Sequence, residues 1–227
     1  MFPNPLRGGR FAAVVHEMIK IKIKESFSQA AFTVSKLVTR VPVKTDGNPH
    51  TTAGLIISAT VDDVQYDRTA KILERASEVG EILGLIKEKR ILDRVIRPEN
   101  CLTCNELLNW ENVDSAIEQL FHRGVATTAL IMPANRHLAC RLFQDTNIQV
   151  VESRLAYRRM IASGAPVDYA RKCWFLGDFS LAFRYKEAWP ITVVPTALDN
   201  GAFLRFKASE QGVATINNPR YVVKCTG

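Results

Sequence analysis

Cys101 and Cys104 form the one pairing in this sequence that a search for chemistry singles out. A CxxC supplies two of the four ligands that zinc needs, and no second CxxC or HxxxH occurs elsewhere in the chain. A redox pair is expected at a helix N-terminus after a buried strand, whereas this one follows Pro98 in a predicted loop. We therefore interpret the cysteines as ordinary thiols and expect no metal and no cofactor, with metal binding or redox chemistry as the alternative.

Nucleophilic and acid–base catalysis find no matching pattern either. The sequence has no G-x-S-x-G elbow, and Gly8-Gly9 is too sparse for a phosphate-binding loop. The paired carboxylates Asp62-Asp63 and Glu78 with Glu81 fall at turn or helix positions that we expect to be solvated. No catalytic residues are predicted, and the protein is not expected to be an enzyme.

Two tryptophans, Trp174 and Trp189, are candidates for stacking on a ligand. Both lie in the β-rich last third of the chain, where large aromatic side chains more often fill a core. We expect both to be core residues.

Composition narrows the class of protein. The chain has 227 residues, of which 47% are hydrophobic, enough for a packed core in one large or two small domains. The odd number of cysteines, five, fits a reducing compartment. A net charge of +7 is compatible with a polyanionic neighbour such as nucleic acid. No apolar run reaches the roughly 18–20 residues of a membrane helix, so no membrane contact is expected.

The N-terminal region carries the highest density of basic residues. From Ile19 to Lys24 isoleucine and lysine alternate, and this period of two favours a strand with a basic ridge of Lys20, Lys22 and Lys24. A helix is the alternative, because Ala12, Val15, Ile19 and Ile23 also share one helical stripe. We expect the segment to be an amphipathic arm that packs on its own domain. The alternative is an arm that reaches a neighbouring subunit or nucleic acid, with Lys20, Lys22 and Lys24 as the candidate nucleic-acid-facing residues.

A turn-rich loop and a long helix are predicted next. Residues 45–54 collect turn formers, including Asp46-Gly47 and Asn48-Pro49. A helix is expected over 67–96, with Asp67 as its N-cap and Pro98 ending it. Its length of roughly 40–45 Å makes it a spine against which a sheet can pack. Its apolar stripe consists of Leu73, Ala76, Val79, Leu83 and Ile86, and its expected i,i+3 ion pairs are Lys71–Glu74 and Arg75–Glu78.

The rest of the chain alternates short helices and strands. We predict helices over 113–122 and 135–144, strands over 126–132 and 148–151, a loop at 163–166, and short strands through 174–227. The mixture places the chain in the α+β class.

Several blocks of the sequence, in their order along the chain, resemble the major capsid proteins of tailed and prophage-like bacteriophages, whose fold encapsulins share. The blocks are FTVSKLVTRVPV at 32–43, the spine segment with KEKRIL at 87–92, WFLGDF at 174–179 with WPITV at 189–193, and FKASE at 206–210 with NPRYVVK at 218–224. The resemblance touches the chain nearly from end to end.

The resemblance implies a phage major capsid fold, with a long spine helix and β-sheet peripheral domain plus a mixed α/β axial domain. It divides the chain into an N-terminal arm and first strand (1–43), a shortened extended-loop region (44–66), the spine helix and peripheral domain (67–112), an axial domain (113–182) and closing strands (183–227). The implied function is a structural subunit of an icosahedral capsid that encloses double-stranded DNA. Its implied partners are other copies of itself, in hexamers and pentamers, and the packaged DNA through non-specific contacts. The implied location is the virion capsid, assembled in the host cytoplasm.

Two alternatives stay open. One is an encapsulin-like compartment, with the same fold around enzymes instead of a genome. The other is a soluble basic nucleic-acid-binding module that uses the lysine ridge, against which stands the lack of aromatic residues between the lysines.

Overall fold

The computed structural model describes residues 9–31, 33–42, 51–60, 63, 68–104, 107–121, 126–196 and 203–226. The chain forms two compact units. The first comprises residues 1–32, 43–87 and 187–212, and the second residues 33–42, 88–186 and 213–227. Helix α3 (Thr69–Val95) and strands β7 (Phe183–Thr196) and β8 (Phe203–Ile216) give residues to both units. The five-segment division predicted from the sequence stays a prediction.

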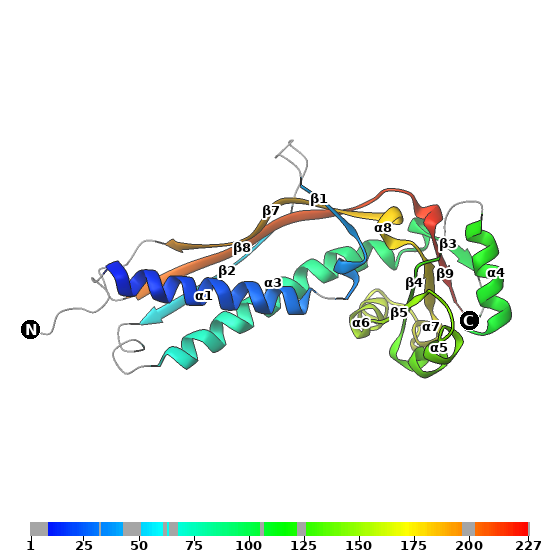
Figure 1. The fold of residues 1–227 in the computed structure, drawn as a ribbon, viewed down its shortest axis with the longest axis horizontal. Coiled ribbons are helices and arrows are strands. Elements are labelled where there is room, and N and C mark those ends of the chain that lie inside the picture. The colour runs from blue at the N-terminus through cyan, green and yellow to red at the C-terminus, as the bar shows by residue number, and fades with distance from the viewer. Residues whose placement is uncertain are drawn as a thin grey trace, which may run out of the picture. The chain divides into compact units, whose positions relative to one another are not determined.

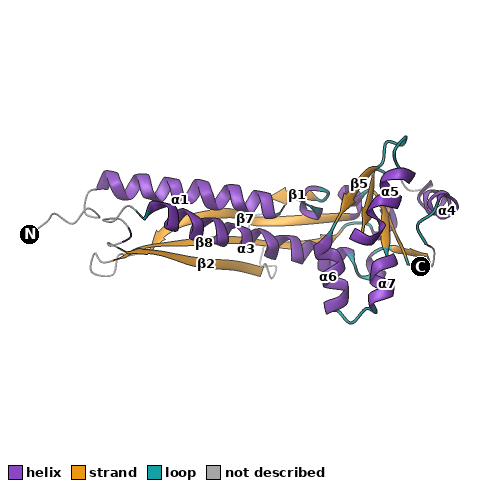
Figure 2. Ribbon diagram, turned by 90° about the horizontal axis from the view of Figure 1, so that it is seen from below, coloured by secondary structure: helices purple, strands orange, loops and turns teal. Residues whose placement is uncertain are grey.

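In the first unit, two helices lie along one face of a sheet (Figures 1 and 2). The helices are α1 (Gly9–Ala30) and α3, and the strands are β2 (Thr51–Thr60), β7 and β8. Strand β2 pairs antiparallel with β8 in a register that runs from Thr51 opposite Gly212 to Thr60 opposite Phe203. The whole four-stranded sheet has the order β1-β7-β8-β2, where β1 is Thr39–Pro42.

The helices of the first unit pack closely because α3 presents glycines to α1. A Cβ added to Gly84 would lie 2.6 Å from the carbonyl oxygen of Phe27, and Gly80 meets the Ile23 carbonyl in the same way one turn earlier. Apolar side chains of α1 and α3 next to this contact pack against the sheet, and together with the side chains of the strands they form one core. Its buried members are Val15, Ile19, Ile23, Phe27, Ala53, Ile57, Ala59, Ile72, Ala76, Leu83, Val193, Phe206 and Ala208.

A buried ion pair lies at the edge of this core. The Lys87 ammonium is fully buried and donates to Glu187 Oε1 at 2.8 Å. The same nitrogen lies 5.5 Å from the centre of the Phe27 ring. The lysine therefore keeps both a carboxylate partner and an aromatic face in place of the water that it loses.

The second unit is built on a five-stranded sheet of order β3-β9-β6-β4-β5. Strand β6 runs antiparallel to both β9 and β4, whereas β3 is parallel to β9 and β5 is parallel to β4. The strands are β3 (Leu102–Cys104), β4 (Thr128–Ile131), β5 (Gln149–Glu152), β6 (Trp174–Gly177) and β9 (Val222–Cys225). The helices are α4 (Trp110–Phe121), α5 (Arg136–Leu142), α6 (Arg154–Ala162), α7 (Val167–Lys172) and α8 (Phe179–Ala182). Single 3-10 turns are η2 (Val34–Lys36), η3 (Pro98–Asn100), η4 (Pro133–Asn135) and η5 (Pro219–Tyr221).

Both faces of this sheet are covered, so its central strands β4, β6 and β9 are buried along their whole length. Alternate side chains enter two cores. Trp174 and Leu176 pack with residues of α4 and α5, such as Val113 and Leu142. Phe175 packs on the other side with residues of α6 and α7, such as Met160 and Ala170. Strands buried on both faces show no polar alternation, which explains why these strands are apolar except for Thr128 in β4 and Lys224 in β9.

Several sequence-based expectations are confirmed at the level of single elements. The long helix predicted over 67–96 is α3, and Ala76 and Leu83 on its expected stripe are buried, while Asp67 lies outside the described residues. The helix predicted over 113–122 is α4, and the one over 135–144 is the shorter α5.

Other expectations are wrong. The predicted loop over 45–54 ends early, because Thr51–Gly54 already belong to β2; residues 45–50 lie outside the described residues. Helices α6 and α7 were not predicted.

Asp63 also differs from its expected place on the surface. Its carboxylate is buried, accepts a hydrogen bond from the Thr60 N–H at 3.2 Å and lies 3.7 Å from the Arg75 guanidinium. The hydrogen bond from the Thr60 backbone, assisted by Arg75, holds the pKa of Asp63 below its usual value against the opposing effect of burial. Arg75 therefore pairs with Asp63, and neither predicted pair, Arg75–Glu78 or Lys71–Glu74, is formed within the described residues.

Candidate subunit interface on helices α1 and α3

Helix α1 has two apolar faces. Val15, Ile19 and Ile23 point into the core of the first unit. The opposite face carries a second stripe at spacings of four and three residues: Val14 at 57%, Met18 at 36% and Ile21 at 54% exposure. A helix that packs only against the core of its own chain needs apolar residues on one face, and its solvent-facing side is normally polar. The outer stripe is therefore a candidate contact surface.

The lysines of the predicted ridge do not share one face, because the segment is helical and not a strand. The strand prediction failed because the apolar residues of 19–24 satisfy both periods. Ile19 and Ile23 are buried whereas Ile21 between them is 54% exposed, and only a helix separates these side chains in this way. Lys20 and Lys24, also four apart, lie on one flank of the outer stripe, and Lys22 lies on the other flank.

The two lysines of the shared flank differ in their partners. The Lys20 ammonium donates to Glu17 at 3.1 Å, an exposed pair of small energetic value. Lys24 is exposed, and within the described residues it has no ion pair. Lys24 is therefore the lysine most available to a partner.

The outward face of α3 has the opposite charge. Glu74, Glu78 and Glu81 are exposed, and none forms an ion pair within the described residues. Two apolar side chains stand beside them, Ile82 at 46% and Leu85 at 42% exposure. Glu78 and Glu81 are exposed as expected, whereas their position beside exposed aliphatic side chains was not predicted.

The two outward faces are complementary in chemistry. The outer face of α1 carries the exposed Lys24, together with the exposed carboxylates of Glu17 and Glu25. The outer face of α3 is acidic at its middle, where Glu78 and Glu81 stand beside Ile82, and it carries exposed lysines at 71 and 89. Within one chain, α1 and α3 already contact each other through their inward faces. The outward face of α1 can therefore meet the outward face of α3 only when the two belong to different copies.

The cysteine and tryptophan residues considered for chemistry in the sequence can now be placed in the fold. Cys101 is buried and its thiol donates to the Val95 carbonyl at 3.2 Å, and burial raises the pKa of Cys101 to about 12. Trp174 is fully buried as expected. Trp189 is 56% exposed, so its assignment to the core was wrong; in the described part of the chain it joins the exposed apolar residues.

Among the described residues no group of three or more His, Cys, Asp or Glu side chains is placed to hold a metal ion. None of the helices in the described ranges combines the length and the apolar character that crossing a membrane requires.

Comparisons with known proteins find no match to the sequence but many matches to the fold. No family model matches the sequence, and no curated protein matches it. Among solved structures, the virus-like particle from Pyrococcus furiosus matches with a TM-score of 0.64 at 13% identity, covering 92% of this chain and 98% of that one. The capsid of the cyanophage P-SCSP1u matches with a TM-score of 0.58 at 10% identity, covering 86% and 88%. The chain has the fold of phage capsid proteins.

The same fold extends to protein compartments. The encapsulin SrpI from Synechococcus elongatus matches with a TM-score of 0.59 at 9% identity, covering 85% of this chain and 86% of that one. The predicted α+β capsid fold, and its sharing with encapsulins, is thus confirmed. In this fold α3 is the predicted spine helix, although identities this low carry no information about individual residues.

Proposed function

We propose that this chain is the structural subunit of a closed, icosahedral protein shell formed by many copies of itself. The observation that carries the proposal is the extent of the structural match. The Pyrococcus furiosus particle protein is covered over 98% of its length by 92% of this chain, so the likeness is that of a whole subunit. A shell subunit acts through its contacts and needs no catalytic residues, in accord with the sequence.

The proposed arrangement follows the predicted one: hexamers and pentamers around double-stranded DNA, in a capsid assembled in the host cytoplasm. The segments assigned from the sequence, 1–43, 44–66, 67–112, 113–182 and 183–227, belong to this proposal. The net charge of +7 favours a polyanionic content. The second candidate is a compartment shell around enzymes, favoured by the match to the Synechococcus elongatus encapsulin.

We place one contact between subunits at the two complementary faces. The stripe of Val14, Met18 and Ile21 on one copy would lie against Ile82 and Leu85 on the next copy. Because the two faces differ, the contact is head-to-tail, and repeating it generates a ring when the rotation closes. Rings of this kind are what hexamers and pentamers require.

Assembly is tested by light scattering and negative-stain electron microscopy of the purified protein over a range of salt and protein concentrations. We expect capsomers, shells or tubes. A species that stays a monodisperse monomer or dimer under all conditions would contradict the shell and would favour the soluble nucleic-acid-binding module. Nucleic acid extracted from purified particles, compared with co-purifying protein, separates a genome from an enzyme cargo.

The contact itself is tested by reversing charges. Lys24→Glu and Glu81→Lys should each reduce assembly, because each places like charges on both faces. The double variant restores opposite charges and should recover assembly. Lys22→Glu makes the same charge change on the other flank of α1 and is the matched control. If the double variant does not recover assembly, the proposed contact between α1 and α3 is wrong, whereas the shell proposal is unaffected.

A further inference from the structure

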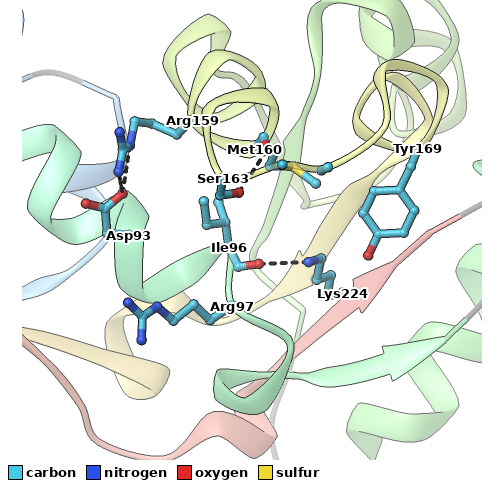
Figure 3. A pocket seen from close by; sticks show the side chains of 10 residues that line it. Asp93, Ile96, Arg97, Arg159, Met160, Ser163, Tyr169 and Lys224 are labelled. Atoms are coloured by element: carbon cyan, nitrogen blue, oxygen red, sulfur yellow. Dashed lines mark hydrogen bonds and ion pairs between the residues drawn. The ribbon is translucent and has the colours of Figure 1, made fainter.

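A cavity of about 420 Å³ in the second unit has a cationic lining that the shell role does not use. Its walls come from the end of α3, from α6 and the loop that follows it, from α7 and from β9 (Figure 3). The charged residues that line it are Arg97, Arg159, Lys224 and Asp93, which leaves the lining with a surplus of two positive charges. The volume corresponds to roughly a dozen water molecules, enough for a polyatomic ion.

Asp93 does not neutralise the whole surplus, because it is engaged by one cation. Arg159 Nη2 lies 2.6 Å and Nε 2.7 Å from Asp93 Oδ1, and Figure 3 shows the two groups facing each other. Arg97 has only a loose contact with Glu99 at 3.8 Å, and both of these side chains are more than half exposed. Arg97 is therefore free to turn its guanidinium toward an anion.

Lys224 is the decisive residue. It lies on β9, only 3% exposed, and its ammonium donates to the Ile96 carbonyl oxygen at 2.7 Å. The nitrogen also lies 5.6 Å from the centre of the Tyr169 ring. Within the described residues no carboxylate pairs with it. One of its three donors is thus used, and the buried charge lacks a counter-ion.

The two buried lysines, Lys224 and Lys87, differ in their partners. Lys87 is equally buried and has Glu187 at 2.8 Å. A buried ammonium without a compensating anion is costly, so proteins usually provide one. Beside the Lys224 ammonium, where such an anion would bind, lies the cavity. The Tyr169 hydroxyl lines the same space and makes no hydrogen bond to any described residue.

We propose that this cavity binds a phosphate-class oxyanion, held by Lys224 and Arg97 with the Tyr169 hydroxyl as a further donor. Lysine supplies a point charge from inside, and arginine supplies a planar pair of donors at the mouth. Bound anion offsets the buried charge and so stabilises the second unit. The proposal goes beyond the shell function and does not depend on assembly.

The test is a titration of the full chain with sodium phosphate, against sodium chloride at matched ionic strength, followed by thermal unfolding and by isothermal titration calorimetry. Phosphate should raise the unfolding midpoint in a saturable way, because a ligand of the native state stabilises it. Arg97→Gln should weaken phosphate affinity at least tenfold. Lys224→Met, similar in shape but neutral, should abolish the phosphate-dependent shift.

Arg94→Gln is the matched control, since Arg94 is exposed on the same helix and does not line the cavity. It should bind phosphate like the parent. Arg97 is an exposed position, so its variant reports even if Lys224→Met fails to fold. The proposal is overturned if phosphate and chloride act alike, or if Arg97→Gln and Arg94→Gln bind equally.

Discussion

Gly84 in α3 lies against the carbonyl group of Phe27 in α1, so closely that a Cβ on the glycine would stand 2.6 Å from the oxygen. The contact sets the separation of the two helices that cover the sheet of the first unit. Side chains of any size at this position push the helices apart.

Gly84→Ala should destabilise the chain by about 1–3 kcal/mol, because overpacking moves the helix backbones. Urea unfolding monitored by circular dichroism measures the effect. Gly54→Ala is the control, since a Cβ there would meet its nearest neighbour at 3.6 Å, an ordinary contact. Equal midpoints for the two variants would show that the helices are not in the described contact.

Leu83→Asp should unfold or severely destabilise the protein. Leu83 is fully buried between α3 and the sheet, and an unpaired carboxylate there costs several kcal/mol. Glu81→Ala, two residues away on the exposed face, should melt like the parent. Thermal unfolding compares the two. A parent-like melting curve for Leu83→Asp would reject the orientation of α3.

The proposed contact of Lys20, Lys22 and Lys24 with packaged DNA predicts a salt-dependent affinity. The logarithm of the binding constant for duplex DNA should fall with log salt by about 0.9 for each phosphate neutralised. Lys20→Gln with Lys24→Gln should flatten the slope more than Lys20→Gln with Lys22→Gln, because only the first pair shares a flank of α1 and both variants lose two charges. Fluorescence anisotropy at several salt concentrations measures it. An unchanged slope when all three lysines are replaced would leave them a role in subunit contacts only.

Cysteine alkylation should follow exposure. In dissociated native subunits at pH 8, Cys140 is exposed and should react rapidly with iodoacetamide. Burial raises the pKa of both Cys101 and Cys173 to about 12, so their thiols stay protonated and unreactive until the chain unfolds. Mass spectrometry of timed samples identifies the labelled residues. Labelling of Cys101 at the rate of Cys140 would contradict its buried position.

The long helix, its buried stripe and the mixed class could be predicted because each depends on local periodicity. Leu83 shows this, since its burial follows from spacing alone. The N-terminal helix could not be decided in this way, because Ile19, Ile21 and Ile23 satisfy a strand while Val15, Ile19 and Ile23 satisfy a helix. The exposure of Ile21 between the buried Ile19 and Ile23 settles the choice, and it depends on the packing of this segment against α3 and the sheet.

The surroundings of Lys224 and Asp63 could not be predicted from the sequence. Lys224 stands in a run of apolar residues, and nothing in its neighbours reveals that it projects toward Tyr169 and a cavity. Asp63 looked like a solvated turn residue until Arg75, twelve positions later, was seen beside it. In each case the partner comes from an element that only the fold brings near.

The buried pair of Lys87 and Glu187 has a consequence for how this protein changes over time. Replacing either residue alone strands a charge away from water, whereas exchanging both for well-packed apolar residues is often tolerated. Natural variants should therefore alter the two positions jointly and seldom singly. Two sites one hundred residues apart in the sequence are in this way inherited as one unit.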